Sequence, residues 1–573
     1  PVMAFFGAIH DAIEHVFESA REAYKGLLEW GLENPLKTVS FFCAFYILSF
    51  VLLLPHIGED FFPTIDAGQL RLHVNAQPGT RVEQTERIYH AVENAIRVLI
   101  PKDEIKVIID NIGMPVSGVN YAFSDSQTIS EADGEILVTL GEHRRHNTEY
   151  YMRQIRKMLT HDFPEVSFYF QPADIVTQIL NAGLPAPIDI QVVGLEPEKD
   201  FVIAQNIRRE VRDVPGAVDV CLHQVVDDPQ FIFNVDRIKA AQMGLTQKDV
   251  SNSVLVNLSS SFQVAPNFWL NTKNGINYNL AAQTPQYKIH SIDNLRTMSL
   301  TSAQTQAASA QDPLHPSQPQ LLTNVATFAR KPTPYVVNHM NVQPLYNIYA
   351  ACQGRDLGGV AMDIKKILEK YRNDLPRGTT IVMGGQVQSM TTAYRALLFG
   401  LIFALVLVYL ILVVNFQSWS DPLIILMAIP GAFSGILWSL FVSQTTFSIP
   451  ALMGTIMCVG VASANSILMI TFANEQYAEL HDGKQAALQA GYQRFRPVVM
   501  TATAMIIGMI PMAIGGGQGG SQNAPIGRAV IGGLSVATLS TLLFVPLIFS
   551  LLRRKRRGHN MDAQSTTGTQ EPQ

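Results

Sequence analysis

The chain has 573 residues, too many for a single domain. Hydrophobic residues make up 47% and charged residues only 16%, which argues against an ordinary soluble protein. A net charge of −5 gives no indication of nucleic-acid binding. The four cysteines are scattered; a Cys221–Cys352 disulfide is one alternative, and two buried free thiols are the favoured one.

The first part of the chain predicts a surface helix and one membrane span. Phe5–Trp30 places apolar residues at helical spacing among charged ones, which indicates an amphipathic helix at the cytoplasmic face within residues 1–37. The apolar run Thr38–Pro55 predicts the first span, within 38–57. The chain starts without an initiator Met, so we expect it to be part of a longer polypeptide.

The next segment predicts an exterior α+β region. Residues 58–172 follow the order β-α-β-β-α-β, that of a split βαβ, ferredoxin-like unit. Its first helix is predicted to begin with a capping box, Thr80-Arg81-Val82-Glu83. The same order starts again in 173–229 and finishes in 343–390, so the sequence predicts a second ferredoxin-like unit interrupted by an insertion, 230–342.

The chain then returns to the membrane over residues 391–552. Basic residues gather between the fourth and fifth spans and at Arg553–Arg557, so the positive-inside rule predicts that both ends are cytoplasmic and the large region lies outside. Residues 553–573 are a basic end followed by a polar tail, predicted to be disordered. With the first span, the bundle has six, the last five being Ala396–Val414, Leu423–Phe441, Ile449–Phe472, Pro497–Ile514 and Ala529–Leu552.

Ile449–Phe472 is predicted to lie at the centre of the bundle. It carries small and polar residues, including Ser463 and Asn465, and an asparagine at this depth needs a partner inside the protein. A structural contact and a functional polar group both remain open for Asn465. No Asp, Glu, Lys, Arg or His lies in the core of the last five spans, so we expect the chain not to transport protons alone.

Five motifs, in order along almost the whole chain, give this architecture a family resemblance. It resembles the second, C-terminal half of a resistance-nodulation-division (RND) efflux permease of the hydrophobe/amphiphile type. The motifs are Gly58-Glu59-Asp60-Phe61-Phe62-Pro63, Gly354-Arg355-Asp356-Leu357-Gly358, Gly384-Gly385-Gln386, Arg494–Thr501 and Gln522–Gly527.

The resemblance implies a homotrimeric pump of the bacterial inner membrane, driven by protons and exporting amphiphilic small molecules. It implies a missing N-terminal half, a periplasmic adaptor and an outer-membrane channel as partners, besides membrane lipid. The two ferredoxin-like units would be periplasmic porter subdomains, and the insertion 230–342 would be the docking subdomain. We expect no cofactor, no nucleic acid and no enzymatic activity.

By the same resemblance, Ser463, Asn465 and Thr501 are the candidates for a polar proton relay. Thr501 matches the family's relay threonine, although a membrane threonine often bonds back to its own helix. Ala464 stands where drug-pump members carry a lysine. This departure keeps open an alternative function, a non-pumping RND-like assembly subunit.

The substrate pocket of drug pumps is lined by phenylalanines, and the corresponding positions here resemble Ile108 and Leu137 on strands and Tyr121 and Phe123 in the loop between them. That loop, Gly113–Gly134, is either a switch loop or an ordinary long connection.

A metal-exporting (Cu/Ag-type) RND protein is a further alternative. Thioethers bind Cu(I), but methionines at helical spacing in a membrane are more often packing residues. His143 and His146 lie beside two arginines, so no metal ligands are assigned. The methionines in question are Met453, Met457, Met469, Met500, Met505, Met509 and Met512.

Overall fold

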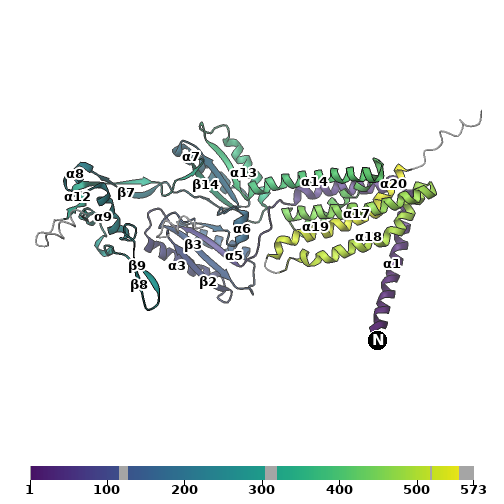
Figure 1. Ribbon diagram of the computed structural model, residues 1–573, viewed down its shortest axis with the longest axis horizontal. Helices are drawn as coiled ribbons and strands as arrows, with labels where there is room; N and C mark the ends of the chain where they lie inside the picture. The colour runs from purple at the N-terminus through teal and green to yellow at the C-terminus, as the bar shows by residue number, and fades with distance from the viewer. Residues whose placement is uncertain (1, 115–126, 303–318, 517–518, 554–573) are drawn as a thin grey trace, which may run out of the picture. The chain divides into compact units, whose positions relative to one another are not determined.

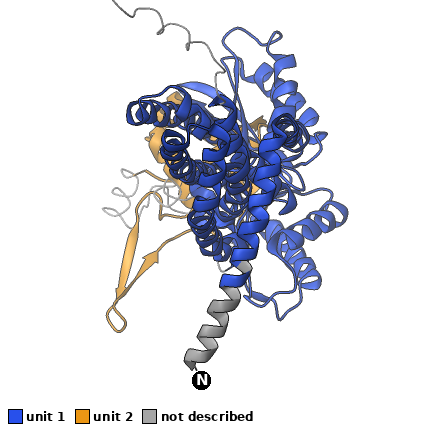
Figure 2. Ribbon diagram, turned by 90° about the vertical axis from the view of Figure 1, so that its right-hand side faces the viewer, with its two compact units in different colours: residues 1–224, 337–573 blue, residues 225–336 orange. Residues whose placement is uncertain are grey.

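The computed structural model describes residues 2–114, 127–302, 319–516 and 519–553 (Figure 1). The chain divides into two compact units (Figure 2). Unit 1 comprises Pro1–Gln224 and Val337–Gln573, and unit 2 is Val225–Val336. The predicted insertion, 230–342, has nearly the same bounds as unit 2.

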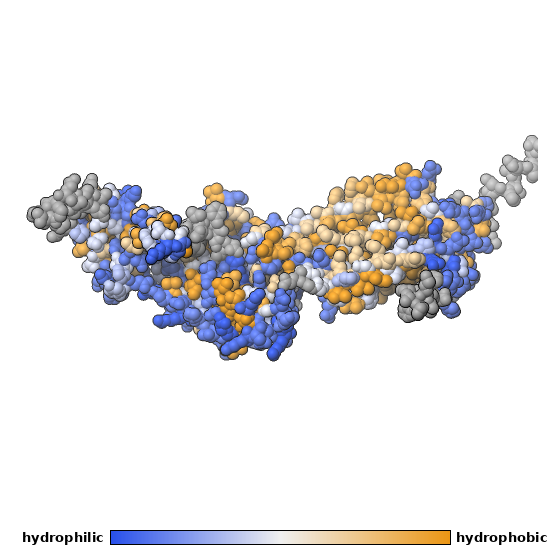
Figure 3. Space-filling view, turned by 60° about the horizontal axis from the view of Figure 1, so that its bottom comes forward, coloured by the Kyte–Doolittle hydropathy of each residue, from blue (hydrophilic) through white to orange (hydrophobic). Residues whose placement is uncertain are grey.

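Within the described residues of unit 1, six helical segments are long and apolar enough to cross a membrane. Hydrophobic residues cover much of the face of the bundle that Figure 3 shows. This confirms the predicted number of spans. The segments are Pro35–His56, Gln386–Phe416, Ser420–Val442, Ile449–Leu480, Gly483–Ile514 and Gly520–Leu552.

Two of the six segments are interrupted where prolines remove backbone donors. The third consists of α15 (Ser420–Leu426) and α16 (Ile429–Val442), with Pro430 in the first turn of α16. The last runs as α19 (Gly520–Leu539), a π-turn over Ser540–Phe544, and α20 (Val545–Leu552).

Pro546 in the first turn of α20 has no N–H to donate to the carbonyl of Leu542, four residues earlier. That carbonyl instead accepts a 2.8 Å hydrogen bond from the Tyr24 hydroxyl of α1 (Val2–Glu33). The proline therefore leaves an acceptor by which the N-terminal helix is joined to the bundle.

Glycines allow α16 and α19 to lie unusually close. A Cβ on Gly435 would be 2.2 Å from the carbonyl oxygen of Gly532, and one on Gly532 would be 2.1 Å from the Cβ of Ser439. The Ser439 hydroxyl also donates to the carbonyl of Arg528 at 2.7 Å. Small residues at this contact let the two helix backbones approach closely, as in other membrane helix pairs.

The first exterior sheet has the strand order β2-β3-β1-β4, with every pair antiparallel. Leu70, Leu72 and Val74 of β1 are buried with residues of α3 and α5, so Arg71 and His73 face the opposite side of the sheet. The elements are β1 (Gln69–Asn75), α3 (Val82–Leu99), β2 (Ile105–Ile112), β3 (Asp133–Leu140), α5 (Thr148–Asp162) and β4 (Ser167–Gln171).

The predicted capping box at the start of α3 is wrong. The N-cap residue is Arg81, and no side chain caps the helix. The Thr80 hydroxyl donates instead to the carbonyl of Gln77 at 2.6 Å, because the turn through Pro78 and Gly79 brings that carbonyl within reach.

The second exterior sheet repeats this arrangement. Two of its strands precede unit 2 in the sequence and the others follow it. Its order is β13-β14-β5-β15, and β6 pairs with β14. The sequence order is again β-α-β-β-α-β, apart from the added short strand β13 (Asn338–Met340). The main elements are β5 (Ile188–Val193), α7 (Pro197–Arg212), β6 (Ala217–Leu222), β14 (Gln343–Cys352), α13 (Leu357–Tyr371) and β15 (Thr380–Gly385).

The first and last long strands of unit 2, β7 (Asp228–Val235) and β12 (Ala326–Thr333), pair antiparallel and so hold its two ends together. Its small core packs α8 (Arg237–Gln242), α9 (Gln247–Ser259) and α12 (Leu322–Val325) around residues such as Val250 and Leu322. A hairpin of β8 (Asn267–Asn271) and β9 (Ile276–Leu280) projects from it (Figure 2).

Candidate substrate and proton sites

Two of the sequence motifs, 297 residues apart, meet in unit 1. The backbone N–H of Glu59 donates to the carboxylate of Asp356 at 3.0 Å, and that of Leu357 donates to Asp60 at 2.8 Å. Both flanking glycines are required for this approach: a Cβ on Gly58 would lie 2.6 Å from that of Asp356, and one on Gly358 would lie 2.8 Å from that of Glu59. The motifs thus join the segment after the first span to the N-terminus of α13.

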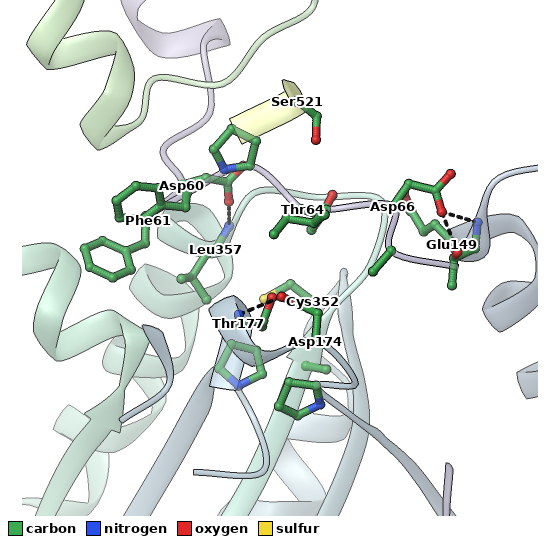
Figure 4. Close-up of a pocket in the computed structure, with 18 of the residues that line it drawn as sticks. Asp60, Phe61, Thr64, Asp66, Glu149, Asp174, Thr177, Cys352, Leu357 and Ser521 are labelled. Atoms are coloured by element: carbon green, nitrogen blue, oxygen red, sulfur yellow. Dashed lines mark hydrogen bonds between the residues drawn. The ribbon is translucent and has the colours of Figure 1, made fainter. Parts of the chain in front are cut away.

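This junction forms one wall of a large pocket of about 840 Å³, a size typical of ligand sites (Figure 4). Other walls come from the start of α5, the end of β14, the loop 444–446 and the first turns of α19. The short helix α6 (Ile175–Leu180) adds Asp174, its N-cap residue, whose carboxylate accepts the N–H of Thr177 at 2.8 Å.

The pocket carries more acidic than basic side chains. Two of its three arginines are paired with carboxylates outside the lining, Arg156 with Asp219 at 2.7 Å and Arg355 with Asp363 at 2.8 Å. Two of its five carboxylates are likewise paired with arginines outside the lining, Asp66 with Arg144 at 2.6 Å and Glu149 with Arg153 at 3.1 Å. Asp60, Asp174 and Asp356 then remain against Arg528. The pocket therefore favours a cationic ligand. Its charged residues are Asp60, Asp66, Glu149, Asp174, Asp356, Arg156, Arg355 and Arg528.

Burial raises the pKa of Asp60, and the nearby charge of Asp356 raises it further, against the lowering effect of hydrogen bonds from Leu357 and Thr446. Asp66 shows the opposite balance: burial would raise its pKa, but hydrogen bonds from Arg144 and Thr148 lower it. A bound cation would stabilise the charged form of Asp60, so cation and proton compete at this carboxylate.

Sequence reasoning did not single out these carboxylates as site residues. Asp60 and Asp356 lie in motifs quoted for the family resemblance, each between glycines and next to an element boundary. An aspartate between glycines at an element boundary was the sequence signal that could have identified them. Only the fold, however, brings the two motifs together.

Within the membrane bundle, two of the predicted relay candidates, Asn465 and Thr501, are in contact. The Thr501 hydroxyl lies 3.2 Å from the side-chain oxygen of Asn465 and 3.0 Å from the carbonyls of both Pro497 and Val498. Asn465 is buried. Ser463 donates to the carbonyl of Val459 at 2.8 Å within its own helix.

The sequence analysis did not predict an ion pair at the end of the bundle where α15 begins and α20 ends. Asp421, whose side chain is 3% exposed, pairs with Arg553 at 3.1 Å, and Asn474 donates to the same carboxylate at 3.3 Å. Arg553 also lies over the rings of Tyr477 and Phe549. The sequence analysis used Arg553 only as a topology marker, because its acidic partner is 132 residues away.

The predicted pocket residues of the first sheet fall on different sides of it. Ile108 packs against the core under the helices, so it does not line the open face. Leu137 lies on that face opposite Ile109, and both are exposed. Ile109, rather than Ile108, is therefore the β2 residue that shares the open face with Leu137. Tyr121 and Phe123 lie outside the described residues.

The methionines of the bundle differ in their burial. Met469 is fully buried, whereas Met453, Met457 and Met500 are largely exposed on the surface of the bundle. In the part of the chain that the structure describes, no three His, Cys, Asp or Glu side chains are placed to hold a metal ion. All four cysteines are free, although Cys352 is only half-buried.

The profile of the AcrB/AcrD/AcrF family matches residues 5–553. The chain belongs to this family. Its architecture, motifs and six apolar helices accord with the RND permeases, which are efflux proteins of the membrane.

Several relatives of this AcrB/AcrD/AcrF-family chain are described by their substrates. The cobalt-zinc-cadmium resistance protein CzcA of Cupriavidus metallidurans is 24% identical over 556 residues, 96% of this chain and 50% of the relative. The nickel and cobalt resistance protein CnrA of the same organism is 24% identical over 554 residues, 96% of this chain and 49% of the relative. The multidrug resistance protein MdtC of Erwinia amylovora is 27% identical over 367 residues, 63% of this chain and 34% of the relative.

The chain thus spans about half the length of the curated relatives it matches. A crystal structure of a heavy metal efflux pump superposes with a TM-score of 0.78 and 24% identity, covering 94% of this chain and 52% of that one. This likeness establishes the shared fold. Heavy-metal efflux proteins predominate among these relatives, so the amphiphile type of the sequence analysis is less well supported than its metal alternative.

Proposed function

We propose that this family member is the second half of a proton-driven RND permease that exports a heavy-metal cation. The observation that carries the proposal is the acidic pocket in which Asp60, Asp174 and Asp356 face a cavity of about 840 Å³. The metal-resistance names of several relatives support the same substrate class.

The complete protein would act from the inner membrane, as a trimer with an adaptor and an outer-membrane channel, and its other half would supply further carboxylates. Heavy-metal cations bind oxygen as well as nitrogen and sulfur ligands. The role of this pocket is to concentrate the cation before transport, since clefts of one charge sign raise the local concentration of counter-ions.

The test uses the complete permease in cells that lack their own metal exporters. Asp60→Asn keeps the size of the side chain and an oxygen for the Leu357 N–H, but removes the charge. We expect zinc, cobalt or cadmium export to fall about tenfold, the scale of losing one supporting group at a metal site. The matched control is Asp374→Asn, an exposed aspartate of unit 1 outside the pocket lining, which should export like the wild type.

Export of amphiphilic molecules is the second candidate. It is favoured by apolar side chains on the open face of the first sheet, where Ile109 is 56% and Leu137 37% exposed. Efflux of a cationic dye and of bile salts, measured in the same cells, separates the two functions. Protection against the amphiphiles with no change in metal tolerance would replace the first proposal by this one.

A further inference from the structure

A small cavity lies where the open face of the first exterior sheet meets the second sheet. Its volume of about 20 Å³ is the size of one water molecule. It is lined by His73 of β1, Asp133 of β3, Tyr169 of β4, and Cys221 and His223 at the end of β6. A histidine of the first sheet and one that directly follows β6 of the second sheet therefore line the same cavity.

The single carboxylate in this space is committed to His73. His73 Nε2 lies 3.4 Å from an Asp133 oxygen, and both side chains are almost fully buried. Asp133 also accepts the backbone N–H groups of Ile129 at 3.0 Å and Ser130 at 2.9 Å. Its charge is thus shared between one imidazole and the loop that precedes β3.

His223 has no such partner among the described residues. The groups that face it are His73 and Asp133 from the first sheet, Tyr169 of β4, its neighbour Cys221, and Tyr349 of β14, whose ring centroid is 5.5 Å from its own. Burial, and then the positive charge of His73, lower the pKa of His223 to about 4, against a smaller opposing effect of Asp133.

The two sheets are joined here through side chains, since no described strand of one pairs with a strand of the other. Arg156 of α5 binds Asp219 of β6 through two bonds of 2.8 and 2.7 Å, and Tyr169 packs against Cys221 and Tyr349. Such a contact can loosen without breaking a β-ladder. Of the side chains that line this cavity, the histidines are the ones whose charge ordinarily changes between pH 5 and 8.

We propose that His73 and His223 form a proton-sensitive contact between the two porter sheets, closed while His223 is neutral and loosened when it is protonated. His223 is half-buried in the closed contact. In the loosened state it is fully exposed to water and its pKa returns toward 6.5. The loosened state then binds more protons between pH 6.5 and about 4, so the closed contact is fully stable above this window and is weakened as the pH falls through it. Between pH 7.5 and 5.0 the equilibrium shifts toward the loosened state by about 30-fold.

Cys221, buried beside His223, is a native reporter of this change. The complete permease in nanodiscs is labelled with 4,4′-dithiodipyridine, which reacts with thiols in acid, and the Cys221 peptide is quantified by mass spectrometry. The rate is divided by that of an introduced surface cysteine, Asp374→Cys, at each pH. We expect the normalised rate to rise by about 30-fold from pH 7.5 to 5.0.

Three variants decide the cause. His223→Gln should abolish the rise, and His73→Gln should move its midpoint to higher pH because the repelling charge is gone. His161→Gln, which alters a histidine that is 88% exposed, should behave as the wild type. A flat wild-type profile, or an unchanged rise in His223→Gln, overturns the proposal. If His223→Gln fails to fold, an unchanged midpoint in His73→Gln overturns it.

Discussion

Thr501 has one hydroxyl proton and three acceptors within 3.2 Å: the Asn465 side chain and two carbonyls of its own helix. These acceptors share one proton, so the bond to Asn465 competes with the bonds back to the helix of Thr501 itself. Asn465 and Thr501 are thus suited to release and remake a hydrogen bond inside the bundle. Ser463 bonds to its own helix and has no described partner on another one.

A pair of substitutions at Thr501 tests this in the complete permease. Thr501→Val keeps the shape and removes the hydroxyl, whereas Thr501→Ser keeps the hydroxyl. We expect Thr501→Val to reduce proton-coupled export by up to about tenfold, the value of one hydrogen bond, and Thr501→Ser to retain most of it. Interhelical hydrogen bonds in membranes average about 0.6 kcal/mol, so both variants should assemble normally. Equal export by Thr501→Val and wild type would make Thr501 a packing residue.

At the scale of elements, helix breaks and close contacts organise the bundle. The prolines that interrupt the third and last spans free backbone acceptors, and Tyr24 uses one of them to dock α1. The α16–α19 contact depends on the absence of side chains at Gly435 and Gly532. Neither feature adds a charge to the membrane, in keeping with the cost of charge there.

The glycine contact can be tested by one methyl group. We expect Gly435→Ala to destabilise the protein by about 1–3 kcal/mol, because its Cβ would overlap the carbonyl oxygen of Gly532 and force the helices apart. The matched control is Gly508→Ala in α18 (Gly483–Ile514), where a Cβ would meet nothing within 4 Å. Thermal unfolding in detergent, followed by loss of the monodisperse chromatographic peak, gives the comparison. A normal midpoint for Gly435→Ala would show that α16 and α19 can separate without cost.

At the scale of the whole molecule, the orientation in the membrane decides which compartment the pocket serves. Basic residues in the first half of α18 and after α20 predict that the start of α18 and the end of α20 face the cytoplasm. The pocket and the exterior sheets would then face the periplasm. An outside pocket suits an exporter that collects its substrate before expelling it.

Two introduced cysteines test the orientation. Asn523→Cys in α19 and Lys484→Cys in α18 both replace exposed residues near opposite ends of α18. An impermeant thiol reagent applied to the outer face of spheroplasts should label Asn523→Cys and leave Lys484→Cys unreacted until the membrane is opened. The reverse pattern would place the acidic pocket in the cytoplasm.

The sequence by itself determined the number of spans, the order of strands and helices in the exterior region, and the family. These follow from signals that are local or periodic: long apolar runs, alternating apolar residues and motifs next to element boundaries. It also singled out Asn465, since a polar residue at membrane depth stands out against its neighbours, and the family resemblance added Thr501.

Only the tertiary structure decided which side chains meet. Asp60 and Asp356, Asp421 and Arg553, and His73 and His223 are each separated by more than a hundred residues, and nothing local relates one member of a pair to the other. Ile108 shows the same limit on a smaller scale. Strand side chains alternate between two faces, so a shift of one residue exchanges core and surface, and the packing of β2 and β3 against the helices makes Ile109 the exposed residue.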